Sequence, residues 1–242
     1  ELESAITKRL DAAWAVGSGN GGLDTGSIAN TTYHVFLIRR SDTGVVDVLL
    51  STSPTSPTMP ANYDQKRRIG SIIRSGGAIL GFHQIGDDFR LKDPVANLGG
   101  ALTTTATLLA VTVPTGIEVL AYLNVAIALS NTTGSRGVCV YSPHENARTP
   151  HPSNYTTYSQ TNTNTNQGRS ASRIHVRTNV SGQVYYDADS SGDTGYITTL
   201  GWIDRRGGSM AQSTEPAATN ITLGTAQATT SGTAKDWVIA RA

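Results

Sequence analysis

The sequence is poor in cysteine: Cys139 is the only one in 242 residues. A single cysteine excludes an intrachain disulfide framework and a zinc site built from several thiolates. Cys139 lies in the apolar run 137–141. Because free cysteine is among the most buried residue types, we expect it to be a small core residue.

Charge is also scarce. Charged residues make up 15% of the chain, whereas soluble domains typically contain ~25%. The formal net charge is only +1, so the chain has no overall field that would attract nucleic acid or an anionic membrane, and we expect neither as a partner. Long apolar runs are missing too: none approaches the ~20 residues of a membrane-spanning helix. No secretory signal opens the sequence, and because it starts with Glu1 we expect it to be the C-terminal piece of a longer protein.

Threonine is abundant and takes the place of much of the missing charge. A β-branched side chain with a hydroxyl suits the solvated face of a strand. Short runs separated by Gly, Pro and Asn turns predict strands over 33–40, 45–51, 66–73, 78–85, 101–114, 118–129, 172–179, 183–188 and 196–204. This spacing indicates an all-β protein whose body is an antiparallel β-sandwich or a jelly-roll-like barrel.

One helix is expected, over residues 1–16. Leu2, Ile6, Leu10 and Ala13 recur on one stripe. A helix this short is marginal in water, so the stripe must pack on the β body or on symmetry copies of itself. The predicted organisation is a helical stem (1–16), a Gly-rich joint (17–26), a β body (27–206) that forms one or two subdomains with a break near 95–101, and a polar C-terminal arm (207–242) that ends in a possible strand.

Residues that could carry chemistry are few. His144, Glu145 and His151 share one Pro-rich loop, where solvated polar side chains are a better explanation than a metal site. A glycosidase needs two carboxylates across a cleft, but Asp87 and Asp88 are adjacent, and the acidic residues at 187, 189 and 193 fit turn chemistry. No nucleophile elbow, P-loop or Rossmann pattern is present. We therefore expect no catalytic residue, no metal and no cofactor.

Cationic residues gather in two patterns. Arginine pairs at 39–40, 67–68 and 205–206 could bind phosphate or an acidic sugar, although a solvated charge near a strand end is the simpler interpretation. In 172–179, Arg173, His175 and Arg177 alternate with Ser172, Ile174 and Val176, which predicts a strand with one cationic face.

The segment 153–167 is the candidate binding site, with a glycan or a polar protein epitope as its expected ligand. It is uncharged and polar, so it should lie on the surface. Tyrosines offer rigid amphipathic contact area, and side-chain amides match sugar hydroxyls as donors and acceptors. The candidate residues are Asn154, Tyr155, Tyr158, Asn162, Asn164 and Asn166. A spacer that serves only solubility is the alternative.

Seven blocks of the sequence form a recognisable set: GLDTG at 22–26, TYHVFLI at 32–38, TGVVDVLLS at 43–51, SPTSPT at 53–58, KRRIGS at 66–71, VRTN at 176–179 and TLGWIDRR at 199–206. These blocks resemble phage and prophage tail-fibre-type proteins. The blocks span most of the chain and end before the 207–242 arm. The resemblance implies a virion component, commonly a homotrimer, displayed on a tail or sometimes a head, for which no catalytic residue is known.

We therefore expect a non-enzymatic receptor-binding module of a phage tail fibre, located on the virion. Its expected partners are two further copies of itself, other virion proteins through the N-terminal end, and a host surface glycan or protein. Two alternatives remain open: a decoration or structural fibre protein of the capsid or baseplate, and a polysaccharide depolymerase.

Overall fold

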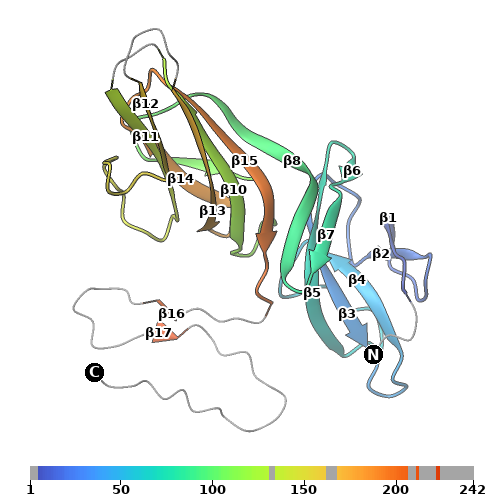
Figure 1. Ribbon diagram of the computed structural model, residues 1–242. Helices are drawn as coiled ribbons and strands as arrows, with labels where there is room; N and C mark the ends of the chain where they lie inside the picture. The colour runs from blue at the N-terminus through green and yellow to red at the C-terminus, as the bar shows by residue number, and fades with distance from the viewer. Residues whose placement is uncertain (1–4, 131–133, 162–167, 207–210, 213–221, 224–242) are drawn as a thin grey trace. The chain divides into compact units, whose positions relative to one another are not determined.

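The computed structural model describes residues 5–130, 134–161, 168–206, 211–212 and 222–223. The described residues up to Asp204 belong to one compact unit, and the few described residues from Arg205 onward belong to a second. Every regular element in the described residues is a β-strand (Figure 1). The prediction of an all-β protein is confirmed. No helix of the described chain is long and apolar enough to cross a membrane.

The N-terminal part of the first unit is a six-stranded sheet with the order β1-β2-β4-β3-β5-β6. Its strands are β1 (Arg9–Ala13), β2 (Gly21–Leu23), β3 (Thr32–Arg39), β4 (Val46–Ser51), β5 (Gln65–Ser75) and β6 (Ala78–Ile79). Alternation along β3 and β4 sends apolar residues to both faces. One face buries Leu10, Leu23, Tyr33 and Leu50, and the other buries Phe36, Ile38, Leu49 and Tyr63.

The rest of the first unit is built from two antiparallel sheets. The larger has the order β13-β10-β15-β8-β7 and consists of β7 (Phe82–Ile85), β8 (Asp88–Ala101), β10 (Leu120–Ala128), β13 (Arg169–Arg177) and β15 (Thr194–Ile203). The smaller has the order β12-β11-β14-β9 and consists of β9 (Thr107–Ala110), β11 (Gly134–Tyr141), β12 (Thr157–Thr161) and β14 (Gln183–Ala188). The second unit contributes the pair β16 (Ala211–Gln212) and β17 (Thr222–Leu223).

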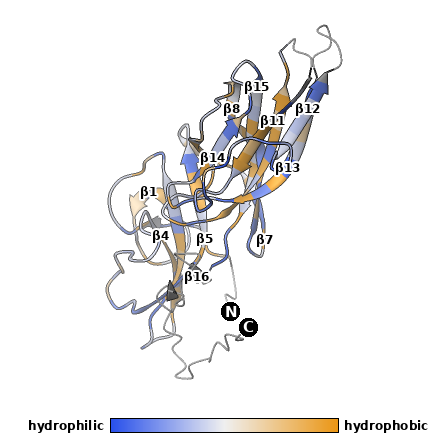
Figure 2. Ribbon diagram, turned by 90° about the vertical axis from the view of Figure 1, so that its left-hand side faces the viewer, coloured by the Kyte–Doolittle hydropathy of each residue, from blue (hydrophilic) through white to orange (hydrophobic). Residues whose placement is uncertain are grey.

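The inner faces of these two sheets share one hydrophobic core, so they form a β-sandwich. Period-2 alternation places the core residues, and the apolar stretch of β11 is coloured orange in Figure 2. The largest fully buried side chains of this core are Trp202, Phe89, Leu123, Ile127, Leu129 and Ile197. Burial of this area supplies most of the driving force for folding of the sandwich.

The helix predicted over 1–16 is wrong for its described residues, 5–16, which contain strand β1. The expected stripe included residues four apart, and a spacing of four fits a period of 2 as well as a period of 3.6. Burial from Ile6 to Trp14 follows the shorter period: even-numbered residues are covered and odd-numbered ones are exposed.

Lys8 and Trp14 explain why the strand is formed. The Lys8 ammonium pairs with Asp47 Oδ2 at 2.9 Å, and both side chains are at most 3% exposed. Lys8 also donates to the carbonyl oxygens of Ala15 and Gly17, and Trp14 Nε1 donates to Val48 O at 3.1 Å. These contacts hold the segment extended along the sheet, because in a helix residues 8 and 14 would lie on different sides and could not both face it.

The remaining strand predictions are confirmed at 33–40, 45–51, 66–73, 118–129, 172–179, 183–188 and 196–204, within a few residues at each end. The run 78–85 is divided between β6 and β7, and the run 101–114 contains only the short β9. Strands β8, β11 and β12 were not predicted as such. The predicted joint at 17–26 contains β2. Strand β8 includes 95–101, the region considered for a subdomain break, and its pairing with β15 shifts register there, between Ala96 and Leu98.

Candidate binding surfaces

The predicted receptor segment lies at one edge of the smaller sandwich sheet. Asn154 and Tyr155 precede β12, and Tyr158 is inside it. The other three candidates, Asn162, Asn164 and Asn166, lie outside the described residues. Of the three described side chains, Asn154 and Tyr155 make specific contacts within the protein, and Tyr158 is exposed.

Tyr155 serves the structure of the sandwich. Its ring lies against Gly137, where an added Cβ would be only 2.3 Å from the ring. Its hydroxyl donates to Asp189 Oδ2 at 2.5 Å, and Asp189 Oδ1 accepts from the Gly137 amide. Burial, followed by the bond to Asp189, raises the pKa of Tyr155 to about 12. The ring and hydroxyl are thus occupied.

The side chain of Asn154 is likewise engaged in hydrogen bonds within the protein, whereas that of Tyr158 is accessible to a partner. The Asn154 amide donates to Thr149 O, and its Oδ1 accepts from the His151 amide at 2.9 Å. The Cys139 thiol also lies at 3.3 Å from this oxygen. Tyr158 points outward from β12 and is 59% exposed. Of the three described candidates, only Tyr158 offers a substantial open surface.

A second surface lies on the outer face of the larger sheet. Along β13 the outward positions are Arg169, Ala171, Arg173, His175 and Arg177, and the first four are exposed. The intervening Ser170, Ser172, Ile174 and Val176 face the interior. The cationic face predicted for this strand is therefore confirmed, and it extends to Arg169.

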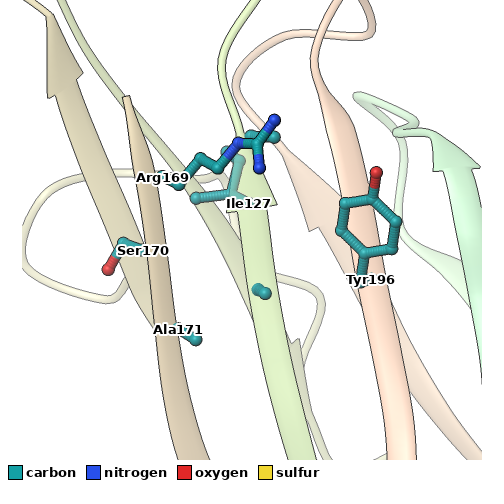
Figure 3. A pocket seen from close by; sticks show the side chains of 7 residues that line it. Ile127, Arg169, Ser170, Ala171 and Tyr196 are labelled. Atoms are coloured by element: carbon teal, nitrogen blue, oxygen red, sulfur yellow. The ribbon is translucent and has the colours of Figure 1, made fainter. Parts of the chain in front are cut away.

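This face contains a hollow of about 370 Å³. Arg169 on β13 and Tyr196 on β15 rise on the two sides of β10 (Figure 3). The floor between them consists mainly of Ala126, Ala128 and Ala171. Pairing fixes this arrangement, because Arg169 is opposite Ala128, and Ala126 is flanked by Ala171 and Tyr196. The Tyr196 side chain is 46% exposed, so the hollow is open to solvent.

A stacked row of side chains crosses the same face farther along. The Arg90 guanidinium lies 4.0 Å from the centroid of the Tyr122 ring, and Tyr122 stacks on His175 with centroids 4.6 Å apart. Arg90 and Tyr122 come from β8 and β10, which are separated by β15, where Gly201 is opposite both. Because Gly201 has no side chain, the two can meet above it. The row rigidifies this end of the face.

The other predicted chemical groups are engaged elsewhere. His144 Nε2 lies 3.0 Å from Glu118, and Glu145 pairs with Arg148. In the described part of the chain, no three potential ligands gather as a metal site. Arg40 pairs with Asp42 and Arg68 with Asp204, so these arginines are neutralised. Cys139 is 1% exposed, as expected, and burial raises the pKa of its thiol to about 12.

No family model matches this sequence, and no curated protein matches it either.

Proposed function

We propose that this chain is a non-catalytic attachment module of a phage tail fibre that binds a glycan on the host surface. The sequence blocks that resemble tail-fibre-type proteins and the all-β sandwich support the virion assignment. The observation that carries the binding role is the open hollow between Arg169 and Tyr196. It combines three features that sugar recognition uses: an aromatic side, a fork of hydrogen-bond donors and a floor of small residues.

Each feature matches a part of a sugar. The ring of Tyr196 presents apolar area for the C–H face of a pyranose, and its hydroxyl both donates and accepts hydrogen bonds. The Arg169 guanidinium offers planar donors for hydroxyl or carboxylate oxygens. The alanine methyls leave room for a ring without a costly side-chain rearrangement. Binding on a preformed strand surface loses little conformational entropy.

A binding role fits the lining better than hydrolysis does. Glycoside hydrolysis requires two carboxyl groups ~5–9.5 Å apart beside the scissile bond. None of the described residues that line the hollow carries a carboxylate. Arg169 and Tyr196 can hold a sugar, but they do not supply the acid and base pair of the usual mechanism.

The homotrimeric state is part of the proposal and rests on the resemblance to fibre proteins. Light scattering of the purified chain at micromolar concentration measures it directly. The expected mass is three times that of the 25.5 kDa chain, and a monomer would contradict this part.

Adsorption to host cells tests the central claim. Fluorescently labelled protein should bind susceptible cells, and the unlabelled protein should delay phage adsorption by competing for the receptor. Cells stripped of surface polysaccharide should bind less. Release of reducing sugars from that polysaccharide would identify a depolymerase instead. Binding that persists on stripped cells would point to a protein receptor.

A further inference from the structure

We propose that the hollow on the larger sheet selects a carboxylated sugar within an acidic glycan, with Arg169 binding the carboxylate and Tyr196 contacting the ring. This inference rests on the proposed attachment function and specifies its ligand. It assigns receptor recognition to β13, β10 and β15 rather than to segment 153–167.

The charge of the face favours an anion. Among the described residues, no carboxylate pairs with Arg169 or Arg173, although most other arginines of the sandwich have one. Arg177, at the far end of β13, is 4.0 Å from Glu118 and is partly neutralised. His175 is exposed but stacks on Tyr122. Among the sandwich arginines, the two without a described acidic partner thus lie at the hollow and beside it.

The width of the hollow suits one sugar ring. Arg169 and Tyr196 belong to strands on either side of β10, so their backbones are separated by two strand spacings, roughly 10 Å. Ala126 lies between Ala171 and Tyr196 in the pairing register. A ring resting on these methyl groups would have Tyr196 at one side, with Arg169 placed diagonally across β10.

Arg173 extends the site along β13. It lies four residues from Arg169 on the same exposed face, or roughly 13 Å along an extended strand. A polymer that carries a carboxylate on successive units can meet both cations, whereas a single sugar meets only one. Two charge contacts would make binding strongly dependent on salt.

A nucleic acid is the other common polyanion, and the surface fits it less well. Single-stranded nucleic acid is usually held by successive aromatic side chains on which bases stack. The described lining of the hollow has one aromatic ring, Tyr196, and a floor of alanines. The net charge of +1 provides no wider positive field.

Calorimetry with defined probes tests the inference. The probes are oligogalacturonate, oligosialate, the methyl ester of the oligogalacturonate and a single-stranded oligothymidylate. The protein should bind at least one of the two acidic glycans, and the neutral ester about tenfold more weakly or not at all, because a charge-assisted bond is lost. Affinity should fall as salt is raised.

Three variants locate the site. Arg169→Gln should weaken binding of the acidic glycan about tenfold. Ala126→Leu keeps the charge but fills the floor, and it should also reduce binding. Arg67→Gln, which removes an exposed arginine from β5, is the matched control and should bind like the wild type. Melting temperatures of all three confirm that they are folded.

The inference is overturned if neither acidic glycan binds, if the ester binds as well as the acid, or if Arg169→Gln and Ala126→Leu leave binding unchanged. Preferential binding of oligothymidylate would also overturn it, in favour of a nucleic-acid surface. In each of these cases, adsorption to host cells would leave the attachment function standing with another ligand. A protein that binds the acidic glycan but never adsorbs to host cells would refute the attachment function alone.

Discussion

Arg68 in β5 and Asp204, the residue after β15, form a two-pronged ion pair with N···O distances of 2.5 and 2.8 Å. Asp204 is 1% exposed, so the pair is largely shielded from water. Arg68 also donates to Ser71, whose hydroxyl lies 2.9 Å from His34 Nδ1. This network links the N-terminal sheet to the end of the central strand of the sandwich.

Removing one partner of this pair should be costly. In Arg68→Gln the buried Asp204 carboxylate would lose its neutralising charge, and breaking a buried pair in this way typically costs ~3–5 kcal/mol. Denaturant unfolding measures the change in the free energy of unfolding. The exposed pair between Arg9 and Asp11 provides the control, because solvent screens such a pair and Arg9→Gln should leave the free energy of unfolding nearly unchanged. Equal effects of the two substitutions would contradict a structural role for Arg68.

His34 should make the protein sensitive to mild acid. Burial, helped by the positive charge of Arg68, lowers the pKa of His34 to about 4. The unfolded chain therefore takes up a proton near pH 6.5 while the folded protein resists it, and stability is lost as pH falls from ~6.5 towards 4. The loss attributable to His34 is on the order of 3 kcal/mol.

Urea unfolding of the wild type and of His34→Gln between pH 7 and 4 measures this effect. Carboxylates also titrate near the lower end of the window, so the difference between the two proteins isolates the histidine. The wild type should lose more stability than the variant over this range. Parallel pH profiles would show that His34 is not the group responsible.

Gly137→Ala should destabilise the sandwich. Its new methyl group would lie 2.3 Å from the Tyr155 ring, so the ring must move and its bond to Asp189 must break or bend. Overpacking of this kind costs ~1–3 kcal/mol. Thermal melting measures the effect. Tyr158→Ala is the control, because it removes an outward-facing ring from the same region and should change stability by only ~0.5 kcal/mol.

Gly201→Ala should be more damaging than Gly100→Ala, although both glycines lie in the larger sheet. A Cβ on Gly201 would be 2.1 Å from the carbonyl oxygen of Phe89, whereas Gly100 has open space. We expect a loss of ~2 kcal/mol or more at Gly201. At Gly100 the change should be neutral or stabilising by ~0.5 kcal/mol, because alanine reduces the entropy of the unfolded chain. Chemical denaturation of both variants compares them, and similar stabilities would refute the close contact.

The sequence predicts those strands whose alternation has a single period. The face of β13 could be assigned because cations and small or apolar residues alternate strictly from Ser172 to Arg177. The helix prediction for the N-terminal segment was wrong for the opposite reason: the spacing of Ile6 and Leu10 fits both the strand period of 2 and the helix period of 3.6. The buried ion pair of Lys8 favours the strand, and it could not be predicted because its partner Asp47 is distant in sequence.

The hollow could not be predicted in the same way. Arg169 and Tyr196 come from two strands that are not paired with each other, and β10 brings them together through its pairing with both. Tyr155 shows the reverse case. It looked available because its segment is polar, but a glycine on β11 receives its ring. Which side chains are free depends on strand neighbours, and local composition does not contain that information.

The position of β15 also determines how the sandwich would resist mechanical force. Tyr196 lies near the start of this strand, and Asp204, clamped by Arg68, follows its end. Tension applied at Tyr196 therefore runs along the strand axis. Antiparallel partners β10 and β8 hold the strand on both sides over almost its whole length. The hydrogen bonds of both ladders are loaded together in shear, so the strand slips only when many of them rupture at once, whereas an edge strand would peel away bond by bond.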